Sequence, residues 1–401
     1  MTSPWGVANA TPQGDGSAYN DRKTFVVKCM ISQYLQKLLG KHPAKTKPII
    51  DAERFDTLKS RLQKELFQPV DESKAFFPEE AALIKSIRTE TAALNRNNIT
   101  RTQAYLAFYN RNPEVHWAFL AHMVSRNGGY HMTDLKSSNM THLLDRAERQ
   151  KFFLFLERAN SAIFADAFPQ LLLYEHSKQK ELPLRRYLPV FRISRFMAPI
   201  WESFIEEPHS PLLTTALIIN EQRMLQERIL KRTRHGEILR RLDFQLQEYL
   251  GFMKVIFPYA NKQKGLHSLT GLTVERFADP KQRIETGKLL YGLLFQHPVV
   301  FRGVGHFTKE IPHTGSREDY WASIYTSDGS TSKDDKIYSP TLHDAWKDQL
   351  FFPPHSFDWF TNESYMEDLR SLPIIKKEDL TNEVLENVKQ LKTLNEMKAI
   401  F

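Results

Sequence analysis

Apolar residues recur every three or four positions along most of this chain, and no run alternates between apolar and polar residues as a series of strands would. Positions three or four apart lie on one face of an α-helix, so this spacing predicts amphipathic helices that bury their apolar faces together. We find no internal repeat. The sequence therefore predicts a mainly α fold: an orthogonal multi-helix domain with an irregular, loop-rich C-terminal layer.

Residue types at the expected helix ends locate several helices in the first half of the chain. Asp51 is a candidate N-cap, and Pro78-Glu79-Glu80 has the proline and acids typical of a first turn. Thr100 is expected to cap the following helix. Residues 143–176 are apolar on nearly all sides, which predicts a central core helix, and Pro169 is expected to divide it.

The second half of the chain has a more varied pattern. A long charged helix is expected from Asn220 towards Phe257, followed by a turn-rich connection over residues 261–281. Residues Ile284 to Phe295 are expected to form one more helix. Val299 to Phe307 is expected to be a short strand or an extended segment. Glu378 to Ala399 has the apolar spacing of an amphipathic helix.

These patterns predict three parts. Residues 1–21 are rich in Gly, Ser, Asn, Thr and Ala without apolar periodicity, which is typical of a disordered leader. Residues 22–375 are expected to form a single mainly helical domain, and residues 376–401 a C-terminal amphipathic helix.

Composition excludes several classes of protein. Cys29 is the only cysteine, so neither an intramolecular disulfide nor a structural zinc site is expected, and a reducing compartment fits. The chain does not start with a basic segment and an apolar run, and no apolar run approaches the roughly 20 residues that span a bilayer. We therefore expect a soluble cytoplasmic protein that does not associate with a membrane.

The net charge of +8 results from 55 basic and 47 acidic residues. An excess of this sign favours anionic partners in general, including nucleic acid and phosphorylated ligands. Because the charges are mostly interspersed, a solvated surface is the preferred interpretation.

No sequence signature of a metal site, a cofactor or a catalytic nucleophile is present. His116 and His122 are six residues apart, so they point to different faces of a helix, and the chain has no HExxH motif. Glu206 and His209 have ExxH spacing, but Pro208 disfavours the helical geometry that would bring them together. Phosphate-loop, complete dinucleotide-binding and GxSxG motifs are all missing. The sequence predicts no metal and no cofactor, and it leaves open whether the protein is an enzyme.

A first candidate site surrounds a double glycine. The helix that opens at Pro113 is expected to end at Gly128-Gly129, and Thr133 is expected to cap the next helix, whose free N–H groups could meet an anion. The candidate ligand-binding residues are Arg126, Asn127, His131 and Asp134. The alternative is that these residues form only caps and a tight connection, which is the commoner case.

A second candidate site is the polar segment from Ile311 to Trp321. Its glycine among hydroxyl groups would let the backbone approach a carboxylate or phosphate, and the neighbouring guanidinium offers a planar fork. The candidate residues are His313, Thr314, Ser316 and Arg317. As an alternative, Thr314 or Ser316 only caps a short helix that contains Tyr320.

A basic stretch over residues 221–241 suggests nucleic-acid binding as another reading. Its candidate contacts to phosphates are Arg228, Lys231, Arg232, Arg234 and Arg240. Apolar residues at helical spacing and intervening acids favour a solvated helix face instead, so nucleic acid is not the preferred partner.

Two sets of motifs resemble those of the YppC-like family of uncharacterised bacillar proteins. The first set consists of Tyr105–Tyr109, His116–Ala118, Met123–Gly129 and Met132–Leu135, and the second is His313–Arg317. The resemblance extends over most of residues 80–370. It implies a bacterial cytoplasmic protein, and it transfers no catalytic role because the family has no assigned activity.

The leading functional hypothesis joins the two candidate sites. It is a cytoplasmic helical protein with an anion- or polar-ligand pocket formed by residues 125–134 and 313–321. Arg126 and Arg317 would hold an anionic small molecule, while His131 or Asp134 could transfer protons. The hypothesis requires the two segments to meet in space. A nucleic-acid-associated protein and a helical protein-interaction module remain as alternatives, and the oligomeric state is left open.

Overall fold

The computed structural model describes residues 45–67, 76–137, 144–180, 182–231, 254–263, 265–274, 279–329, 336–351 and 358–399. The chain divides into two units, residues 1–45 and 46–401, and the described helices and strands all belong to the second unit. The expected leader, Cys29 and the span 232–253 lie outside the described residues.

The prediction of a mainly α fold is confirmed. The longer helices are α2 (Ala52–Phe67), α3 (Pro78–Leu94), α4 (Asn98–Arg111), α5 (His116–Asp134), α7 (Arg146–Lys180), α9 (Met197–Glu206), α10 (Ser210–Leu225), α12 (Pro280–Phe295), α13 (Pro298–Glu310) and α16 (Thr381–Ala399). The short ones are α8 (Leu184–Tyr187), α14 (Glu318–Trp321), α15 (Leu342–Ala345), the 3₁₀ segments η1 (Leu188–Phe191) and η3 (Glu363–Leu369), and the π-helical turn η2 (Gln226–Leu230).

Strands form three two-stranded sheets within the described residues. The strands are β1 (Thr46–Pro48), β2 (Lys254–Gln263), β3 (Leu266–Thr273), β4 (Tyr325–Thr326), β5 (Ile337–Tyr338) and β6 (Ser371–Pro373). β2 and β3 make an antiparallel hairpin, β1 pairs antiparallel with β6, and β4 pairs parallel with β5.

Helix ends follow local capping chemistry. Pro78 opens α3 as expected, and the Glu80 carboxylate accepts a hydrogen bond from the Phe77 N–H at 2.8 Å. The expectation for Thr100 is wrong by three residues. Asn97 is the N-cap of α4 and accepts from the Thr100 N–H, while Thr100 lies inside the first turn. Both residues belong to one reciprocal cap, so the sequence located the helix start closely.

The long helix α7 passes through Pro169 without a break, which corrects the expected division. Proline removes one backbone N–H and crowds the preceding turn, a cost of about 3 kcal/mol in an isolated helix. Phe164, Phe168 and Leu171 on either side of it are all at most 2% exposed. Burial of both halves against the neighbouring helices outweighs the local preference of one residue.

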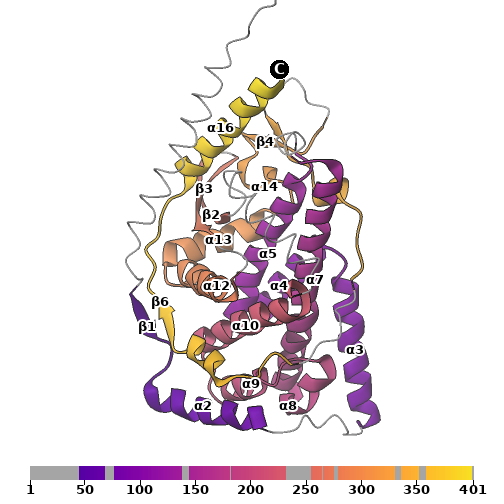
Figure 1. Cartoon of the computed structure of the whole chain (residues 1–401), viewed down its shortest axis with the longest axis vertical. Coiled ribbons are helices and arrows are strands. Elements are labelled where there is room, and N and C mark those ends of the chain that lie inside the picture. Colours follow the sequence, from indigo (N-terminus) through magenta and orange to yellow (C-terminus); the bar gives the residue numbers. More distant parts are fainter. Residues whose placement is uncertain are drawn as a thin grey trace, which may run out of the picture. The chain divides into compact units, whose positions relative to one another are not determined.

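Helices α4, α5, α7 and α10 pack around one apolar core, and α12 packs against α10 and α5 (Figure 1). Tyr105 of α4 meets Trp117 of α5 edge to face at 5.4 Å and Phe164 of α7 at 5.2 Å between ring centroids. Large rings at the meeting point of three helices fix their spacing, because each ring buries on the order of 150–250 Å².

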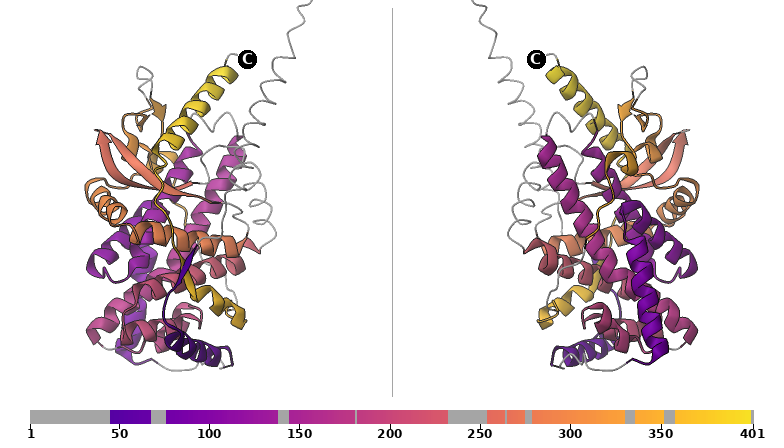
Figure 2. Two further views of the ribbon diagram at one scale, coloured as in Figure 1. Left: turned by 90° about the vertical axis from the view of Figure 1, so that its left-hand side faces the viewer. Right: turned by 90° about the vertical axis from the view of Figure 1, so that its right-hand side faces the viewer.

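Three expectations for the second half of the chain are wrong. Phe257 lies in β2, and β3 occupies part of the span 261–281, which was expected to be turns. Val299–Phe307 lies in helix α13, not in a strand. The hairpin packs on α13 through β2 and against α16 through β3 (Figure 2). Because helices cover it, its residues do not alternate in polarity, and the signal for a strand is weak.

The described helices include none that is both long and apolar enough to cross a membrane.

Candidate functional site

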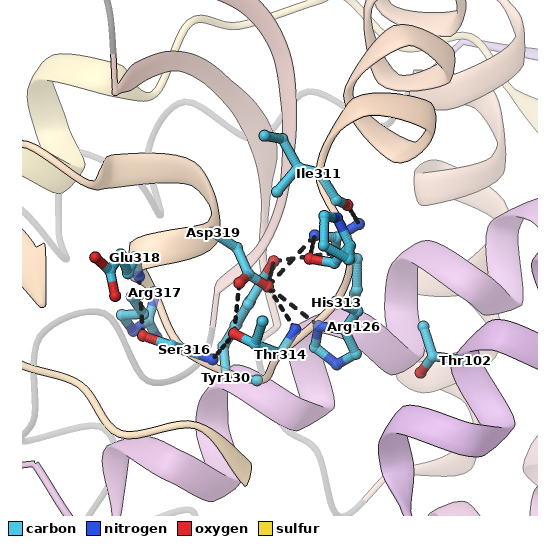
Figure 3. A network of polar contacts seen from close by, with 12 residues as sticks. Thr102, Arg126, Tyr130, Ile311, His313, Thr314, Ser316, Arg317, Glu318 and Asp319 are labelled. Carbon is cyan, nitrogen blue, oxygen red and sulfur yellow. Dashed lines mark hydrogen bonds and ion pairs between the residues drawn. The ribbon is translucent and has the colours of Figure 1, made fainter. Parts of the chain in front are cut away.

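The two polar segments singled out in the sequence meet in space, at a junction between α5 and residues 311–319 (Figure 3). Arg126 makes the first connection. Its guanidinium donates to the backbone oxygens of Ile311 at 3.0 Å and Pro312 at 3.2 Å, and it lies 3.3 Å from the Asp319 carboxylate. The Arg126 side chain is 1% exposed and stacks over the ring of Phe307. The N–H groups of the Arg126 guanidinium therefore point to other groups of the protein.

Asp319 is the acceptor on which this junction converges (Figure 3). Its carboxylate accepts from the Thr314 N–H at 3.1 Å, the Thr314 hydroxyl at 2.5 Å and the Tyr130 hydroxyl at 3.2 Å. Burial alone would raise the pKa of Asp319, but the contacts with His313, Arg126 and Thr314 outweigh it and lower the pKa. Asp319 is thus held as a carboxylate inside the protein.

His313 links this carboxylate to helix α4. Its Nε2 lies 2.9 Å from the Asn98 Oδ1, and its Nδ1 lies 3.4 Å from the Asp319 Oδ2. The Asn98 amide in turn donates to the Ser125 carbonyl and hydroxyl oxygens at 2.8 and 3.1 Å. Burial, reinforced by the charge of Arg126, lowers the pKa of His313 to about 4 although Asp319 opposes it.

Arg317 and Asp134 form a second connection between the same two segments. The guanidinium donates to both carboxylate oxygens, at 2.7 and 2.6 Å, and also contacts the Tyr320 hydroxyl. Burial would raise the pKa of Asp134, but the charge of Arg317 outweighs burial and lowers it. His131 is partly buried beside this pair, with its Nδ1 3.8 Å from the Asp134 carboxylate.

The remaining candidates have different positions. Ser316 donates to the Ser339 carbonyl at 2.5 Å and so ties the segment to the end of β5. Asn127 lies away from the junction: its amide donates to the Ile256 carbonyl at 2.8 Å and accepts from the Ile256 N–H at 2.9 Å. Asn127 therefore extends the hydrogen bonding of strand β2 onto α5.

The expected helix stop is wrong. Helix α5 continues through Gly128-Gly129 to Asp134, and Thr133 lies inside it. The Thr133 hydroxyl donates to the backbone oxygens of Tyr130 and Gly315, so it fastens the second segment and does not cap a new helix. The candidate side chains of the junction are thus bonded mainly to one another and to the backbone, and they join two parts of the fold.

A cavity of about 150 Å³ lies on the other face of α5, between α4, α7, α10 and α12. Trp117 lines it and is nine residues from Arg126, about two and a half helical turns, which places the two on opposite faces. The apolar part of its wall consists of Trp117, Leu120, Ala121, Val124, Ile163, Ile218, Val255, Val274 and Leu290.

Polar side chains also line this cavity, and none of them was named as a candidate ligand-binding residue, although Tyr105 and Ser125 belong to the motifs found in the sequence. They are Arg101, Tyr105, Ser125, Asn160, Glu221, Gln222, Arg283 and Thr286. Burial raises the pKa of Glu221 to about 7, although the Gln222 amide, which donates to it at 2.7 Å, and the Arg283 charge oppose the shift. In the sequence, Tyr105 was named only as part of the family motif Tyr105–Tyr109. Its place in the cavity wall depends on the packing of other helices against α4.

Of the two described basic candidates, Arg228 turns inward and Lys231 is exposed. Arg228 lies 3.4 Å from the Asp166 carboxylate, is 11% exposed, and donates to the Arg192 carbonyl at 2.8 Å. Lys231 pairs with Glu227 at 2.6 Å. The other basic candidates, Arg232, Arg234 and Arg240, lie outside the described residues.

Within the ranges that the structure describes, no three His, Cys, Asp or Glu side chains gather closely enough to hold a metal ion.

These features define a class: a mainly helical protein with a buried polar junction on one side of helix α5 and a cavity on the other. The chain belongs to the family described as "Protein of unknown function (DUF2515)", which it matches over residues 93–386. It is also 38% identical over 318 residues to "Uncharacterized protein YppC" of Bacillus subtilis (strain 168), an alignment that covers 78% of this chain and 94% of that protein. No solved structure matches. The resemblance to the YppC-like family is confirmed.

Proposed function

We propose that the protein binds a small organic molecule in the cavity between α4, α5, α7, α10 and α12. The observation that supports this proposal is the combination of an apolar wall with a few buried polar side chains and a perturbed carboxyl group, Glu221, around one cavity. Such combinations are typical of ligand sites. A volume of about 150 Å³ accommodates a molecule about the size of benzene or slightly larger.

The pocket expected from residues 125–134 and 313–321 is not the site that we favour. Arg126, Asp134 and Arg317 each have a carboxylate or guanidinium partner across the junction. A ligand there would have to displace those buried pairs, at a cost of several kcal/mol. Ser125 is the one residue of the first segment that lines the proposed cavity, and Asn98 connects it to His313.

Filling the cavity tests the proposal. Ala121 is a half-buried wall residue on α5, and Ala121→Phe adds a ring where the ligand would lie. Toluene is a suitable probe because it matches the apolar wall. At about ten times its dissociation constant it should stabilise the unmodified protein by about 1.4 kcal/mol, and the variant by much less.

The matched control is Ala107→Phe, which adds the same ring to an exposed position of α4. Saturation-transfer NMR with toluene and urea unfolding with and without toluene give two independent measurements. Equal toluene responses of the Ala121→Phe variant and the unmodified protein would show that the cavity is not the site.

A further inference from the structure

Two residues that line the cavity each have a buried hydrogen-bond donor with unused capacity. Arg101 and Tyr105 lie one turn apart on α4, are 1% and 3% exposed, and both line the cavity. The terminal nitrogens of Arg101 donate to the Asn95 Oδ1 at 3.1 Å and the Glu157 Oε1 at 2.6 Å. Neither the Arg101 Nε nor the Tyr105 hydroxyl has a hydrogen-bond partner among the described residues. Buried polar groups are seldom left in this condition.

The chemistry of these two groups specifies what would satisfy them. A guanidinium has only donors, so the Arg101 Nε requires an acceptor. The tyrosine hydroxyl can donate to the same acceptor. Glu157 already balances the charge of Arg101, so the acceptor does not have to be an anion. An ammonium group has only donors, so it would not satisfy the Arg101 Nε.

We infer that the ligand has a compact apolar body and ends in a hydrogen-bond acceptor, a carboxylate or an amide carbonyl, which lies against Tyr105 and Arg101. This inference depends on the proposed function, because it specifies the ligand class for the same cavity. The apolar body would pack on Leu120, Ile163 and Ile218. A carboxylate and an amide share the required acceptor and differ in charge.

An amine is the competing ligand class. Glu221 lines the same cavity and is a partly exposed acid, so an ammonium group could pair with it instead. The acid already accepts from the Gln222 amide at 2.7 Å, whereas the Arg101 Nε and the Tyr105 hydroxyl have no partner among the described residues. These two donors without a partner therefore favour a ligand that has a hydrogen-bond acceptor over one that has a donor.

Four compounds with one ring and similar size separate these possibilities: benzamide, benzoate, benzylamine and toluene. Each is titrated into the full chain, into Tyr105→Phe and into the control Tyr109→Phe, whose ring stacks on Phe119. Benzamide or benzoate should bind about tenfold more tightly than toluene. The Tyr105→Phe change should weaken the tighter of the two about five- to tenfold, leave toluene within twofold, and leave the unfolding midpoint unlowered. The Tyr109→Phe variant should bind all four as the unmodified protein does.

Each outcome distinguishes this inference from the proposed function. Tighter binding of benzoate than of benzamide identifies a charged head, the reverse order identifies a neutral head, and both orders support an acceptor. If benzylamine binds best, or if Tyr105→Phe weakens toluene as much as benzamide, the inference is wrong although the cavity still binds ligands. If none of the four binds, the proposed function fails as well.

Discussion

At the scale of single residues, Gly129 is important because it has no side chain. A Cβ at this position would lie 2.5 Å from both the Asn98 Oδ1 and the His313 Nε2, whereas a Cβ at Gly128 would meet nothing closer than 3.5 Å. The absence of a side chain at Gly129, and not at Gly128, therefore leaves room for the hydrogen bond between His313 and Asn98 to lie directly against α5. Glycine near a helix end is commonly a cap, so the sequence pattern alone favours the wrong explanation. The deciding contacts come from residues distant in the chain.

We expect Gly129→Ala to destabilise the protein by about 2–4 kcal/mol, because the new methyl group must push apart a buried hydrogen bond, and this outweighs the gain in helix propensity of about 1 kcal/mol. Gly128→Ala is the matched control in the same helix, and it should be neutral or stabilising by up to about 1 kcal/mol. Urea unfolding of both variants measures the difference. Equal stabilities would mean that the close approach at Gly129 is unimportant.

At the scale of elements, the sequence identified both polar segments of the junction but could not establish how they are used. Polar residues in a helix and in a loop indicate that hydrogen-bond partners are needed, and either a ligand or another segment can supply them. The helices with strong apolar spacing, such as α2 and α12, were predictable from local pattern. The hairpin β2–β3 and helix α13 were not, because each is determined by contact with the other. A Cβ at Gly303 of α13 would overlap the Tyr259 carbonyl of β2.

The junction predicts a local effect of Arg126→Lys. Lysine keeps the charge but cannot donate to Ile311, Pro312 and Asp319 together, so buried acceptors lose their donor. We expect faster amide exchange across residues 311–320, by about 100-fold, corresponding to roughly 3 kcal/mol of local stability. Exchange in α12 should change much less. Hydrogen-exchange mass spectrometry resolves the two regions.

The control for this experiment is Arg111→Lys, since Arg111 is half-exposed and pairs with Glu175 near the surface. Its exchange profile should match that of the unmodified protein, because exposed ion pairs contribute at most about 1 kcal/mol. A uniform change over the whole chain in Arg126→Lys would indicate global destabilisation and contradict a local fastening role.

At the scale of the whole molecule, the mainly α fold and the family could be predicted, and the cavity could not. Each helix contributes an ordinary amphipathic stripe, and nothing in the stripe of α4 distinguishes Tyr105 from a core tyrosine. The cavity exists because side chains from several helices, among them Ile163 of α7 and Ile218 of α10, do not fill the space between them. Such a space is a property of the packed assembly, which local periodicity does not record.

Two buried histidines give the folded chain a pH dependence. Burial lowers the pKa of His122 to about 3 and that of His313 to about 4, so both stay neutral in the folded state. In the unfolded chain a histidine takes up a proton near pH 6.5. The unfolded state therefore binds more protons below pH 6.5. As a result, the free energy of unfolding decreases as the pH falls from 6.5 towards 4. Glu221, with its pKa raised to about 7, titrates in the opposite sense over part of this range.

The contribution of one histidine is isolated by comparing a variant with the unmodified protein, since the Glu221 effect is common to both. His122 donates from Nδ1 to the Thr102 carbonyl at 2.8 Å, and the amide of His122→Asn can supply the same donor without titrating. Between pH 7.5 and pH 5 the variant should lose about 2 kcal/mol less unfolding free energy than the unmodified protein. The exposed His306→Asn on α13 is the control and should follow the unmodified profile. Parallel urea-unfolding profiles for His122→Asn and the unmodified protein would show that His122 is protonated equally in both states, and the argument from its burial would fail.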